Sequence, residues 1–502
     1  MVTPSPRPRP RPIDLADLVP DAPASVEITG IAMDSRLTRP GDVYLAVPGS
    51  NAHGAAFAAQ AVAGGAVAII TDAAGRRLIE AAAATTQSAA AAAVPVAVVD
   101  DPRAMAGALA DRVYDHPSAG MTVIGLTGTN GKTTMSFLLE SVLRAAGHVT
   151  GIMGTTGHRV AGRLLPTERT TPEAVEVHGI LGHMRDEGVT AVVMEVSSHA
   201  MVYGRVAQVD FDAAVFTNLT QDHLDFHGTM AAYFEAKAGL FEHPSHRIIC
   251  LDDQWGRELA GRWPDAVGYA VDSERAAWRV EDLQPAADGT GFTIIDPSGV
   301  RRSARVGLPG RFNVANALGT VACAVTLGID VDTAIAGVAD CAGVPGRMQS
   351  VGNSRGIRAY VDYAHTPDAV ERAISATPGR VIAVLGCGGD RDPMKRPMMG
   401  EAAARLSDVL VITDDNPRSE DPAAIRAAMT EGAMSVPDSV RAQIIEVGDR
   451  RAAIRAAVEA AAPGDAVLVL GKGHEQGQTV GDTYTPFDDV VELAAALEVA
   501  GT

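Results

Sequence analysis

The chain has 502 residues, of which 47% are apolar and 21% are charged, and its formal net charge is −19. This length corresponds to roughly three globular domains, each able to bury a core of its own. The negative charge argues against a nucleic-acid-binding surface, because such a surface needs concentrated positive charge. There is no uninterrupted apolar run of about 18 residues, so we expect no membrane insertion.

The four cysteines lie far apart in the sequence and form no CxxC pair. This pattern is typical of a reducing compartment, so we expect a cytoplasmic protein without disulfides or a zinc site. Residues 1–12 alternate Pro and Arg and lack the apolar segment of a signal peptide. We interpret them as a short disordered tail, with a basic docking arm as the alternative.

Residues 13–115 predict a small α/β domain. Strand patterns at 41–47, 66–71 and 94–99 alternate with Ala-rich helical stretches. The segments 33–36 and 48–54 place hydroxyls and polar backbone groups in loops. We interpret these loops first as turns and second as the edge of a ligand site.

The most informative stretch is residues 123–134, VIGLTGTNGKTT. An apolar strand precedes a Gly-rich turn, and a helical pattern runs from Lys132 to Ala146. Backbone N–H groups of such a turn surround an anion, the lysine reaches the β- and γ-phosphates, and the following hydroxyl holds Mg²⁺. The general motif has Gly where this chain has Leu126, whereas the form TGTNGKTT is complete. The predicted phosphate-binding residues are Thr127, Gly128, Thr129, Asn130, Gly131, Lys132, Thr133 and Thr134.

Further polar residues follow strands of the same predicted domain, residues 116–345. A continuous apolar strand ends at Glu195, and a carboxylate next to a phosphate-loop strand is the usual second anchor for Mg²⁺. His223 follows another strand and is flanked by acidic residues, so we interpret it as a ligand. Asn313 and Asn316 lie on one helical face, where their amides suit a planar heterocycle or a helix cap.

Lysine is rare in this chain. Only Lys132, Lys237, Lys395 and Lys472 occur among the 42 Lys and Arg residues, so Arg serves elsewhere as the cation. Lysine is expected to remain where a compact or chemically reactive amine is needed. Lys237 lies in a helical pattern, where it is either a salt-bridged surface residue or a residue with special chemistry.

The last predicted domain, residues 346–502, contains four strands that each lead into a polar loop. In a parallel, doubly wound sheet these loops all meet at the carboxyl-end edge, where ligands bind. The four loops begin near residues 362, 386, 414 and 471.

Together these motifs resemble the ATP-dependent Mur ligases of bacterial peptidoglycan precursor synthesis. The segments that carry the resemblance, in the order of the family, are TGTNGKTT, MEVSSH, TNLTQDHLDFHG, YFEAKAGLF, GRFNVANALG, PGRM, DYAHTPD and GCGGDRD. The resemblance implies an α/β protein of three domains. These are a small N-terminal UDP-binding domain, a central P-loop ATPase-like parallel sheet and a C-terminal Rossmann-like doubly wound domain.

The resemblance also implies ligands for residues that match family positions. The UDP-substrate residues would be Met33, Ser35, Ser50, Asn51, Ala52, Thr170, Thr171, Ser197 and Arg205. Tyr203 stands where some relatives have Gln, so that contact is not transferred. ATP would additionally contact Asn313, Asn316, Arg347 and Asp362. Lys237 matches a lysine that reacts with CO₂ to form a carbamate, and two Mg²⁺ sites would use Thr133, Glu195, His223 and carbamylated Lys237.

The charges of the loop residues in the last domain indicate which amino acid would be added. meso-Diaminopimelate carries a distal carboxylate and ammonium, which require a guanidinium and an acid respectively. The residues implied are Arg391, Asp415, Asn416, Pro417, Arg418, Gly471 and Glu475. Lysine lacks the distal carboxylate and would leave Arg418 unpaired, so diaminopimelate is favoured.

The implied activity is an ATP-dependent C–N ligase acting through an acyl phosphate, with Lys132, Lys237, His223 and Glu195 as catalytic residues. It would add meso-diaminopimelate to UDP-N-acetylmuramoyl-L-alanyl-D-glutamate, and we expect a monomer. The alternatives are a lysine-adding homologue, a folylpolyglutamate-synthase-like ligase and, in another class, a P-loop ATPase switch.

Overall fold

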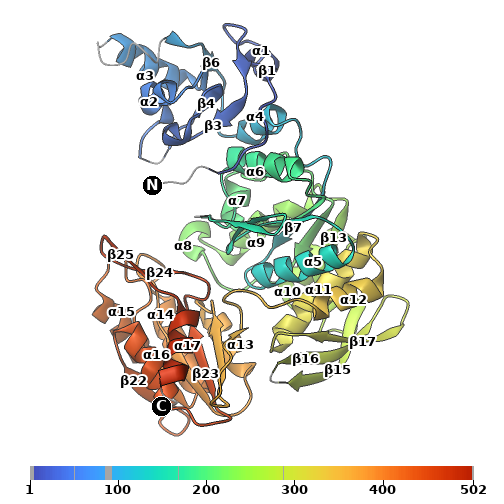
Figure 1. Ribbon diagram of the computed structural model, residues 1–502, viewed down its shortest axis with the longest axis vertical. Helices are drawn as coiled ribbons and strands as arrows, with labels where there is room; N and C mark the ends of the chain where they lie inside the picture. The colour runs from blue at the N-terminus through green and yellow to red at the C-terminus, as the bar shows by residue number, and fades with distance from the viewer. Residues whose placement is uncertain (1–4, 50, 85–92, 168, 287, 500–502) are drawn as a thin grey trace. The chain divides into compact units, whose positions relative to one another are not determined.

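A computed structural model describes residues 5–499 except 50, 85–92, 168 and 287 (Figure 1). By internal packing the chain divides into two compact units, each made of separate segments. The first unit comprises Met1–Thr127, Gly147–Ala214 and Glu235–Arg247, and the second comprises Gly128–Ala146, Val215–Phe234 and Ile248–Thr502. The division falls inside the predicted central domain, directly after the strand that precedes the Gly-rich turn.

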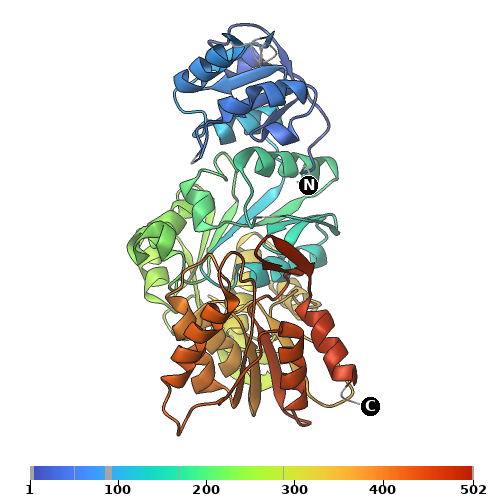
Figure 2. The ribbon, with the colours of Figure 1, turned by 90° about the vertical axis from the view of Figure 1, so that its left-hand side faces the viewer.

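The first unit begins with a four-stranded parallel sheet in the order β3-β4-β5-β6, shown in blue in Figure 2. Alternate residues of its strands face opposite sides. Val43 and Leu45 pack with Leu109 of α4, whereas Tyr44 and Ile69 pack with the α2 and α3 side. The elements of this part are β1 (Ile13–Asp14), α1 (Leu15–Leu18), β2 (Glu27–Ile28), β3 (Gly30–Ala32), β4 (Asp42–Ala46), α2 (Ala58–Ala63), β5 (Ala68–Thr71), α3 (Ala73–Ala84), β6 (Val96–Val98) and α4 (Ala106–Val113).

A second sheet of the first unit has the strand order β10-β9-β8-β11-β7. Strands β8, β11 and β7 are parallel, whereas β9 and β10 form an antiparallel extension. Strand β11 is buried along its whole length, as expected for a parallel strand covered on both faces. The elements are β7 (Thr122–Thr127), β8 (Thr150–Gly154), β9 (Gly157–Val160), β10 (Arg163–Leu165), α6 (Ala174–Asp186), β11 (Ala191–Glu195) and α7 (Ser198–Val202).

The N-terminal Pro-Arg segment contacts acidic residues far along the chain. We predicted a disordered tail over residues 1–12, but residues 5–12 are described and make specific contacts. Arg7 Nη1 lies 2.6 Å from Asp42 Oδ1, and the backbone N–H of Arg9 donates to Asp186 Oδ2 at 2.7 Å. The buried Asp42 and the carboxylate of Asp186 offset part of the entropic cost of ordering this Pro-Arg segment, and the disordered tail stays a prediction.

The second unit contains the helix that follows the Gly-rich turn and a sheet ordered β13-β14-β15-β16-β17. The alternating sequence of residues 291–307, with the turn residues 296–299 at its centre, predicts a β-hairpin, and β16 and β17 do pair antiparallel. Strands β12 and β13 each have residues in both units. The elements are α5 (Lys132–Ala145), β12 (Ala213–Phe216), α8 (Leu224–His227), α9 (Met230–Ala238), β13 (His246–Cys250), α10 (Gln254–Arg262), β14 (Val267–Ala270), β15 (Trp278–Ala286), β16 (Gly289–Ile295), β17 (Arg301–Val306), α11 (Arg311–Thr326) and α12 (Val331–Ala339).

The C-terminal part of the second unit is a six-stranded sheet in the order β18-β19-β23-β20-β21-β22. All neighbouring pairs from β19 to β22 are parallel, so the carboxyl ends of the four predicted strands meet at one edge, as predicted. The elements are β18 (Gln349–Ser350), β19 (Arg358–Asp362), α13 (Pro367–Ser375), β20 (Val381–Leu385), α14 (Lys395–Leu406), β21 (Val409–Ile412), α15 (Pro422–Met434), β22 (Gln443–Glu446), α16 (Arg450–Glu459), β23 (Ala466–Leu470), β24 (Gly477–Val480), β25 (Thr483–Pro486) and α17 (Asp489–Val499).

Helices cover both faces of this sheet (Figure 1). On one face Leu410 and Leu468 pack with α13, α14 and α15, and on the other Val411 and Val467 pack with α16 and α17. This doubly wound arrangement holds the strand ends in place. Within the described residues, no helix combines the length and apolar character needed to cross a membrane.

A buried ion pair fixes the two helices on the second face. Arg450 donates from Nε and Nη2 to the two carboxylate oxygens of Asp489 at 2.8 and 2.7 Å, and both side chains are 0% exposed. Arg450 Nη2 also donates to the carbonyl of Leu470 at 2.9 Å, the last residue of β23. The pair therefore connects α16 and α17 to the loop that begins at residue 471.

We predict that Arg450→Ala destabilises the protein by about 3–5 kcal/mol, because it leaves the Asp489 carboxylate buried without a partner. Urea unfolding followed by circular dichroism measures the change. Arg451→Ala is the matched control, since Arg451 pairs with Glu492 at an exposed position on the same helix. Equal unfolding midpoints for the two variants would contradict the prediction.

Candidate functional site

The Gly-rich turn of the second unit has the geometry of a phosphate loop. Gly128 and Gly131 have φ values of 140° and 91°, in the range that favours glycine. Lys132 Nζ donates to the carbonyls of Gly128 and Thr129 at 2.8 and 2.9 Å, so its ammonium lies over the loop. The backbone N–H groups of Thr129 and Asn130 donate to Asn218 at 2.8 and 3.1 Å, which holds the loop from the strand-following segment.

Residues predicted to bind ATP lie around this loop. Arg347 Nη2 lies 3.2 Å from the Thr133 hydroxyl, so the predicted contribution of Arg347 near the phosphates has a geometric basis. A Cβ on Gly131 would lie 2.5 Å from Asn316 Oδ1, which places that amide against the turn. Asn316 Nδ2 donates to Asn313 Oδ1 at 3.2 Å, and Asn313 Nδ2 donates to the Pro309 carbonyl. The two buried asparagines therefore also brace the start of α11.

Asp362 and its neighbours form a second polar group of the same unit. Asp362 Oδ2 accepts from the backbone N–H of Met348 at 2.6 Å, and burial raises the pKa of its carboxyl against the opposing effect of Arg347. The Arg347 guanidinium lies 4.5 Å from the centroid of the Tyr363 ring, within cation–π range. Burial raises the pKa of the Tyr363 hydroxyl to about 12, so it stays protonated at neutral pH.

His223 lies in a cluster of titratable side chains around the carboxylate of Asp222. Its Nε2 lies 3.4 Å from Asp222 Oδ2, and its backbone is left-handed with φ of 53°. Burial acts to raise the pKa of Asp222, but His223, His365 and Lys395 lower it by more, so this carboxylate is charged at neutral pH. Burial lowers the pKa of His365. Positively charged or titratable groups from three separate segments, at residues 223, 365 and 395, thus act on one carboxylate.

In the first unit, five of the predicted substrate and metal residues lie close together: Thr170, Thr171, Glu195, Ser197 and Arg205. Thr171 Oγ1 donates to the Glu195 carbonyl at 2.8 Å and accepts from the Ser197 N–H at 3.2 Å. Thr170 Oγ1 lies 2.9 Å from Thr155 Oγ1, which in turn donates to Glu195 Oε2 at 2.9 Å. Arg205 Nη1 donates to the Thr171 carbonyl at 3.2 Å. These residues come from four separate segments, so only the fold brings them together.

Lys237 is buried, with a relative exposure of 1%. This excludes the alternative in which it is an exposed, salt-bridged surface lysine. A buried amine carries a large desolvation cost unless it is paired or chemically modified. Burial is compatible with a special role for Lys237, and carbamylation stays a prediction.

The donor chemistry of the predicted metal residues fits Mg²⁺. The described residues contain no group of three or more His, Cys, Asp or Glu side chains that could hold a metal. Mg²⁺ needs few protein ligands, however, because it keeps several waters and binds substrate phosphates. The Thr133 hydroxyl and the Glu195 carboxylate supply oxygen donors. His223 is a poorer match, because Mg²⁺ prefers oxygen to imidazole nitrogen.

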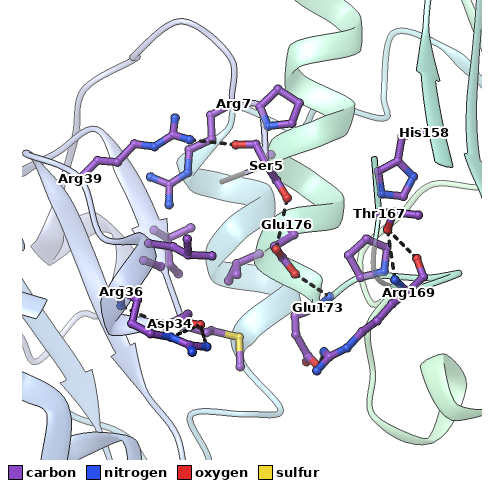
Figure 3. Close-up of a pocket in the computed structure, with 18 of the residues that line it drawn as sticks. Ser5, Arg7, Asp34, Arg36, Arg39, His158, Thr167, Arg169, Glu173 and Glu176 are labelled. Carbon is purple, nitrogen blue, oxygen red and sulfur yellow. Dashed lines mark hydrogen bonds and ion pairs between the residues drawn. The ribbon is translucent and has the colours of Figure 1, made fainter. Parts of the chain in front are cut away.

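A pocket of about 440 Å³ opens in the first unit (Figure 3). Its wall includes Met33, one of the residues predicted to contact the uridine nucleotide, together with Arg36, Arg39 and Arg103. Ser35 does not line it, because its hydroxyl donates to Gln60 at 2.8 Å. Asn51 and Ala52 are exposed and lie outside the pocket lining, and Ser50 lies outside the described residues.

The C-terminal loops of the second unit bring most of the predicted amino-acid-binding residues together. Asn416 Nδ2 donates to Glu475 Oε2 at 2.7 Å, and a Cβ on Gly471 would lie 2.6 Å from Asp415 Oδ2. Arg418 Nη1 donates to the Gly389 carbonyl at 2.6 Å, which connects two strand-end loops. Pro417 packs there as well, since a Cβ on Gly389 would lie 1.9 Å from its carbonyl oxygen. Arg391 is exposed and lies outside this contact network.

The sequence-based assignment missed Lys472. This lysine is 0% exposed, and its Nζ lies 3.6 Å from both Asp415 Oδ1 and Glu475 Oε2, beyond hydrogen-bond distance of a described partner. It compensates two carboxylates at once. The rarity of lysine in the chain could have indicated this residue, since Lys472 and Lys395 are the two of the four lysines to which the sequence assigned no role.

Three family models match consecutive parts of the chain. They are described as Mur ligase family, catalytic domain (residues 27–114), Mur ligase middle domain (residues 126–324) and Mur ligase, glutamate ligase domain (residues 346–473).

Whole-length relatives agree with these matches. A UDP-N-acetylmuramoyl-L-alanyl-D-glutamate–2,6-diaminopimelate ligase of Streptomyces coelicolor is 46% identical over 482 residues, covering 94% of this chain and 93% of the relative. A solved structure of an enzyme with the same name is 30% identical, with a TM-score of 0.68, covering 98% of this chain and 100% of that one. A MurF ligase from Thermotoga maritima in complex with ADP has a TM-score of 0.65 at 19% identity, covering 94% and 98%. These similarities confirm the predicted three-domain α/β fold class.

We predict a pH-dependent effect of Glu475 on stability. Burial, followed by Asp415, raises the pKa of this carboxyl above its ordinary value of 4.5. The charged form therefore destabilises the folded state above the raised pKa, and this penalty disappears as the pH falls below 4.5. Glu475→Gln should raise the thermal midpoint by a few degrees at pH 8 and leave it unchanged at pH 4.

Thermal unfolding across this pH range measures the difference between the variant and the unmodified protein. Glu459→Gln, at an exposed glutamate of α16, is the control and should change nothing. A constant difference at every pH would contradict the assignment.

Proposed function

The chain belongs to the Mur ligase family, and we propose that it adds meso-2,6-diaminopimelate to UDP-N-acetylmuramoyl-L-alanyl-D-glutamate at the expense of ATP. The observation that carries this proposal is the loop network of Asp415, Asn416, Arg418 and Glu475, which offers cationic and acidic groups at one sheet edge. In this proposal residues 13–115 bind the uridine nucleotide, residues 116–345 bind ATP and residues 346–502 bind the amino acid.

ATP is the proposed energy source because the phosphate loop is complete. Backbone N–H groups of the loop and the Lys132 ammonium would neutralise the β- and γ-phosphates. Arg347, 3.2 Å from the Thr133 hydroxyl, would add positive charge at the same phosphates. The MurF ligase from Thermotoga maritima, a protein of the same fold, was solved in complex with ADP, which agrees with an adenine nucleotide as a ligand.

The reaction has two steps. An oxygen of the D-glutamate carboxylate attacks the γ-phosphorus, forms a P–O bond and displaces ADP, which gives an acyl phosphate. The uncharged amine of diaminopimelate then attacks the acyl carbon, loses a proton and expels inorganic phosphate, which forms the amide. The first step joins two anions, so positive charge at the reacting phosphate is required.

Residues of this chain would provide that charge and hold the groups in position. Lys132 would bind the transferred phosphate, and Glu195 and the Thr133 hydroxyl would hold Mg²⁺, which supplies charge neutralisation when bound. Thr170, Thr171, Ser197 and Arg205 would position the nucleotide substrate. Lys237 as a carbamate would place an anion where an unmodified lysine places a cation.

Diaminopimelate is favoured over lysine by the charges of the C-terminal loops. The distal carboxylate needs a guanidinium, and Arg418 lies among these loops whereas Arg391 is exposed. The distal ammonium needs an acid, and Asp415 and Glu475 lie beside the same loops. A folylpolyglutamate-synthase-like activity is less well supported, because it would not use a uridine-nucleotide pocket. An ATPase switch would leave these loops without a ligand.

Phosphate release tests the proposal. The purified protein is given ATP, Mg²⁺ and UDP-N-acetylmuramoyl-L-alanyl-D-glutamate, with diaminopimelate, lysine or no amine in parallel. We expect release to require an amine and to be fastest with diaminopimelate. Equal release without an amine would support a switch, and preference for lysine would identify a lysine-adding enzyme.

We predict that Arg418→Ala lowers kcat/KM for diaminopimelate by about 100-fold, since a charge-assisted pair with the distal carboxylate is lost. The KM for ATP should be unchanged. Arg391→Ala, at the exposed arginine, is the matched control and should have a smaller effect. Equal losses with diaminopimelate and lysine would mean that Arg418 holds the loops without recognising the carboxylate.

We predict that Lys237→Arg nearly abolishes turnover and that added bicarbonate does not restore it, because a guanidinium does not form the carbamate. ATP binding and the thermal midpoint establish that the variant is folded. Isotope-labelled bicarbonate followed by NMR detects the carbamate in the unmodified protein. A fully active variant, or no carbamate signal, would contradict this role.

A further inference from the structure

The N-terminal Pro-Arg segment forms part of the pocket in the first unit. We call residues 5–11 the strap. Ser5, Pro6 and Arg7 of the strap line the pocket together with residues of β3 and of α6 (Figure 3). No motif of the sequence predicted this, because the segment has the composition of a disordered tail.

The strap packs closely against glycines of the first unit. Gly182 of α6 lies under Pro8, and a Cβ there would come within 2.8 Å of the Pro8 ring. Gly30 leaves room for the pair of Arg7 and Asp42, since its Cβ would lie 2.3 Å from Asp42 Oδ1. A glycine within a helix costs about 1 kcal/mol relative to alanine, so its presence under the strap has a packing reason.

Arg7 is the anchor of the strap. Its Nη1 donates to both carboxylate oxygens of Asp42 at 2.6 and 2.8 Å, and the Asp42 side chain is 2% exposed. Arg7 itself is 16% exposed, so one side of its guanidinium remains available to the pocket. The strap also receives a hydrogen bond, because Arg39 Nη2 donates to the Ser5 carbonyl at 2.9 Å.

The charges of the pocket are unbalanced. Its lining carries five arginines, at positions 7, 36, 39, 103 and 169, against the carboxylates of Asp34, Glu173 and Glu176. Arg36 pairs with Asp34, and both Arg103 and Arg169 pair with Glu173. Arg39 forms no ion pair with a carboxylate of the described residues, and burial followed by the neighbouring Arg7 lowers its pKa. A guanidinium pair in this position is suited to a phosphate group.

We propose that Arg7, delivered by the strap, and Arg39 bind the diphosphate of the uridine nucleotide substrate. This inference rests on the proposed function, because it takes this pocket to be the nucleotide pocket. The strap would thus complete a phosphate site in the nucleotide domain, separate from the ATP phosphate loop in sequence. The planar guanidiniums of Arg7 and Arg39 can donate hydrogen bonds to phosphate oxygens, whereas the surrounding carbonyls can only accept them.

Isothermal titration with UDP and with uridine tests the inference on the full-length protein. We expect Arg7→Ala and Arg39→Ala to weaken UDP binding about tenfold or more and to leave uridine binding unchanged. Arg9→Ala is the matched control, because only the backbone N–H of Arg9 is used, toward Asp186. Gly182→Leu retains both arginines but displaces Pro8, so it should also weaken UDP binding.

Arg7→Ala leaves Asp42 without its partner, so thermal unfolding accompanies each titration. If Arg7→Ala does not fold, Gly182→Leu and Arg39→Ala decide the matter. Unchanged UDP affinity in these variants overturns the inference, and equal losses for UDP and uridine overturn it as well, since they indicate a structural role. If the unmodified protein neither binds UDP nor releases phosphate with an amine, the proposed function fails. If it does both while the variants bind UDP as tightly as the unmodified protein, only the role of the strap is refuted.

Discussion

Parallel strands that return through helices all present their carboxyl ends at the same edge of a sheet, and the chemistry of this protein depends on that constraint. The buried residues of strands β19, β20, β21 and β23 pack against helices on both faces of the sheet, so these strands hold the loops at their carboxyl ends in place. The loops at residues 362, 386, 414 and 471 therefore carry the polar groups. Hydrogen bonds between loops, such as the bond from Asn416 to Glu475, join them into one network.

The second constraint is charge. A chain with a net charge of −19 must bind phosphates and carboxylates, so its cations are concentrated where they are needed. Lys132 lies over the phosphate loop, Lys472 is buried between Asp415 and Glu475, and Arg39 faces the pocket without a carboxylate partner among the described residues. Each of these cations is partly or fully removed from water, which strengthens its interaction with an anion.

These features together explain why the proposed ligase needs three kinds of site. ATP requires a loop of backbone donors with one lysine, the nucleotide substrate requires a pocket with guanidiniums for its diphosphate, and the amino acid requires both signs of charge. Folylpolyglutamate synthesis does not share the second of these requirements, because it uses no uridine nucleotide. The relationship to diaminopimelate-adding ligases, at 46% identity over nearly the whole chain, agrees with the presence of all three.

The sequence by itself determined the local elements: the strand, turn and helix around Lys132, the hairpin of β16 and β17, and the strands that end at the four polar loops. These follow from hydrophobic period, glycine placement and short-range spacing, which act over a few residues. Tertiary structure alone decided that Lys472 is buried between two acids, that Arg391 is exposed while Arg418 joins the loops, and that Arg7 contacts Asp42. The contact of Arg7 with Asp42 spans 35 residues, and that of Asn416 with Glu475 spans 59. Such contacts depend on burial and charge supplied by distant segments, which no local pattern contains.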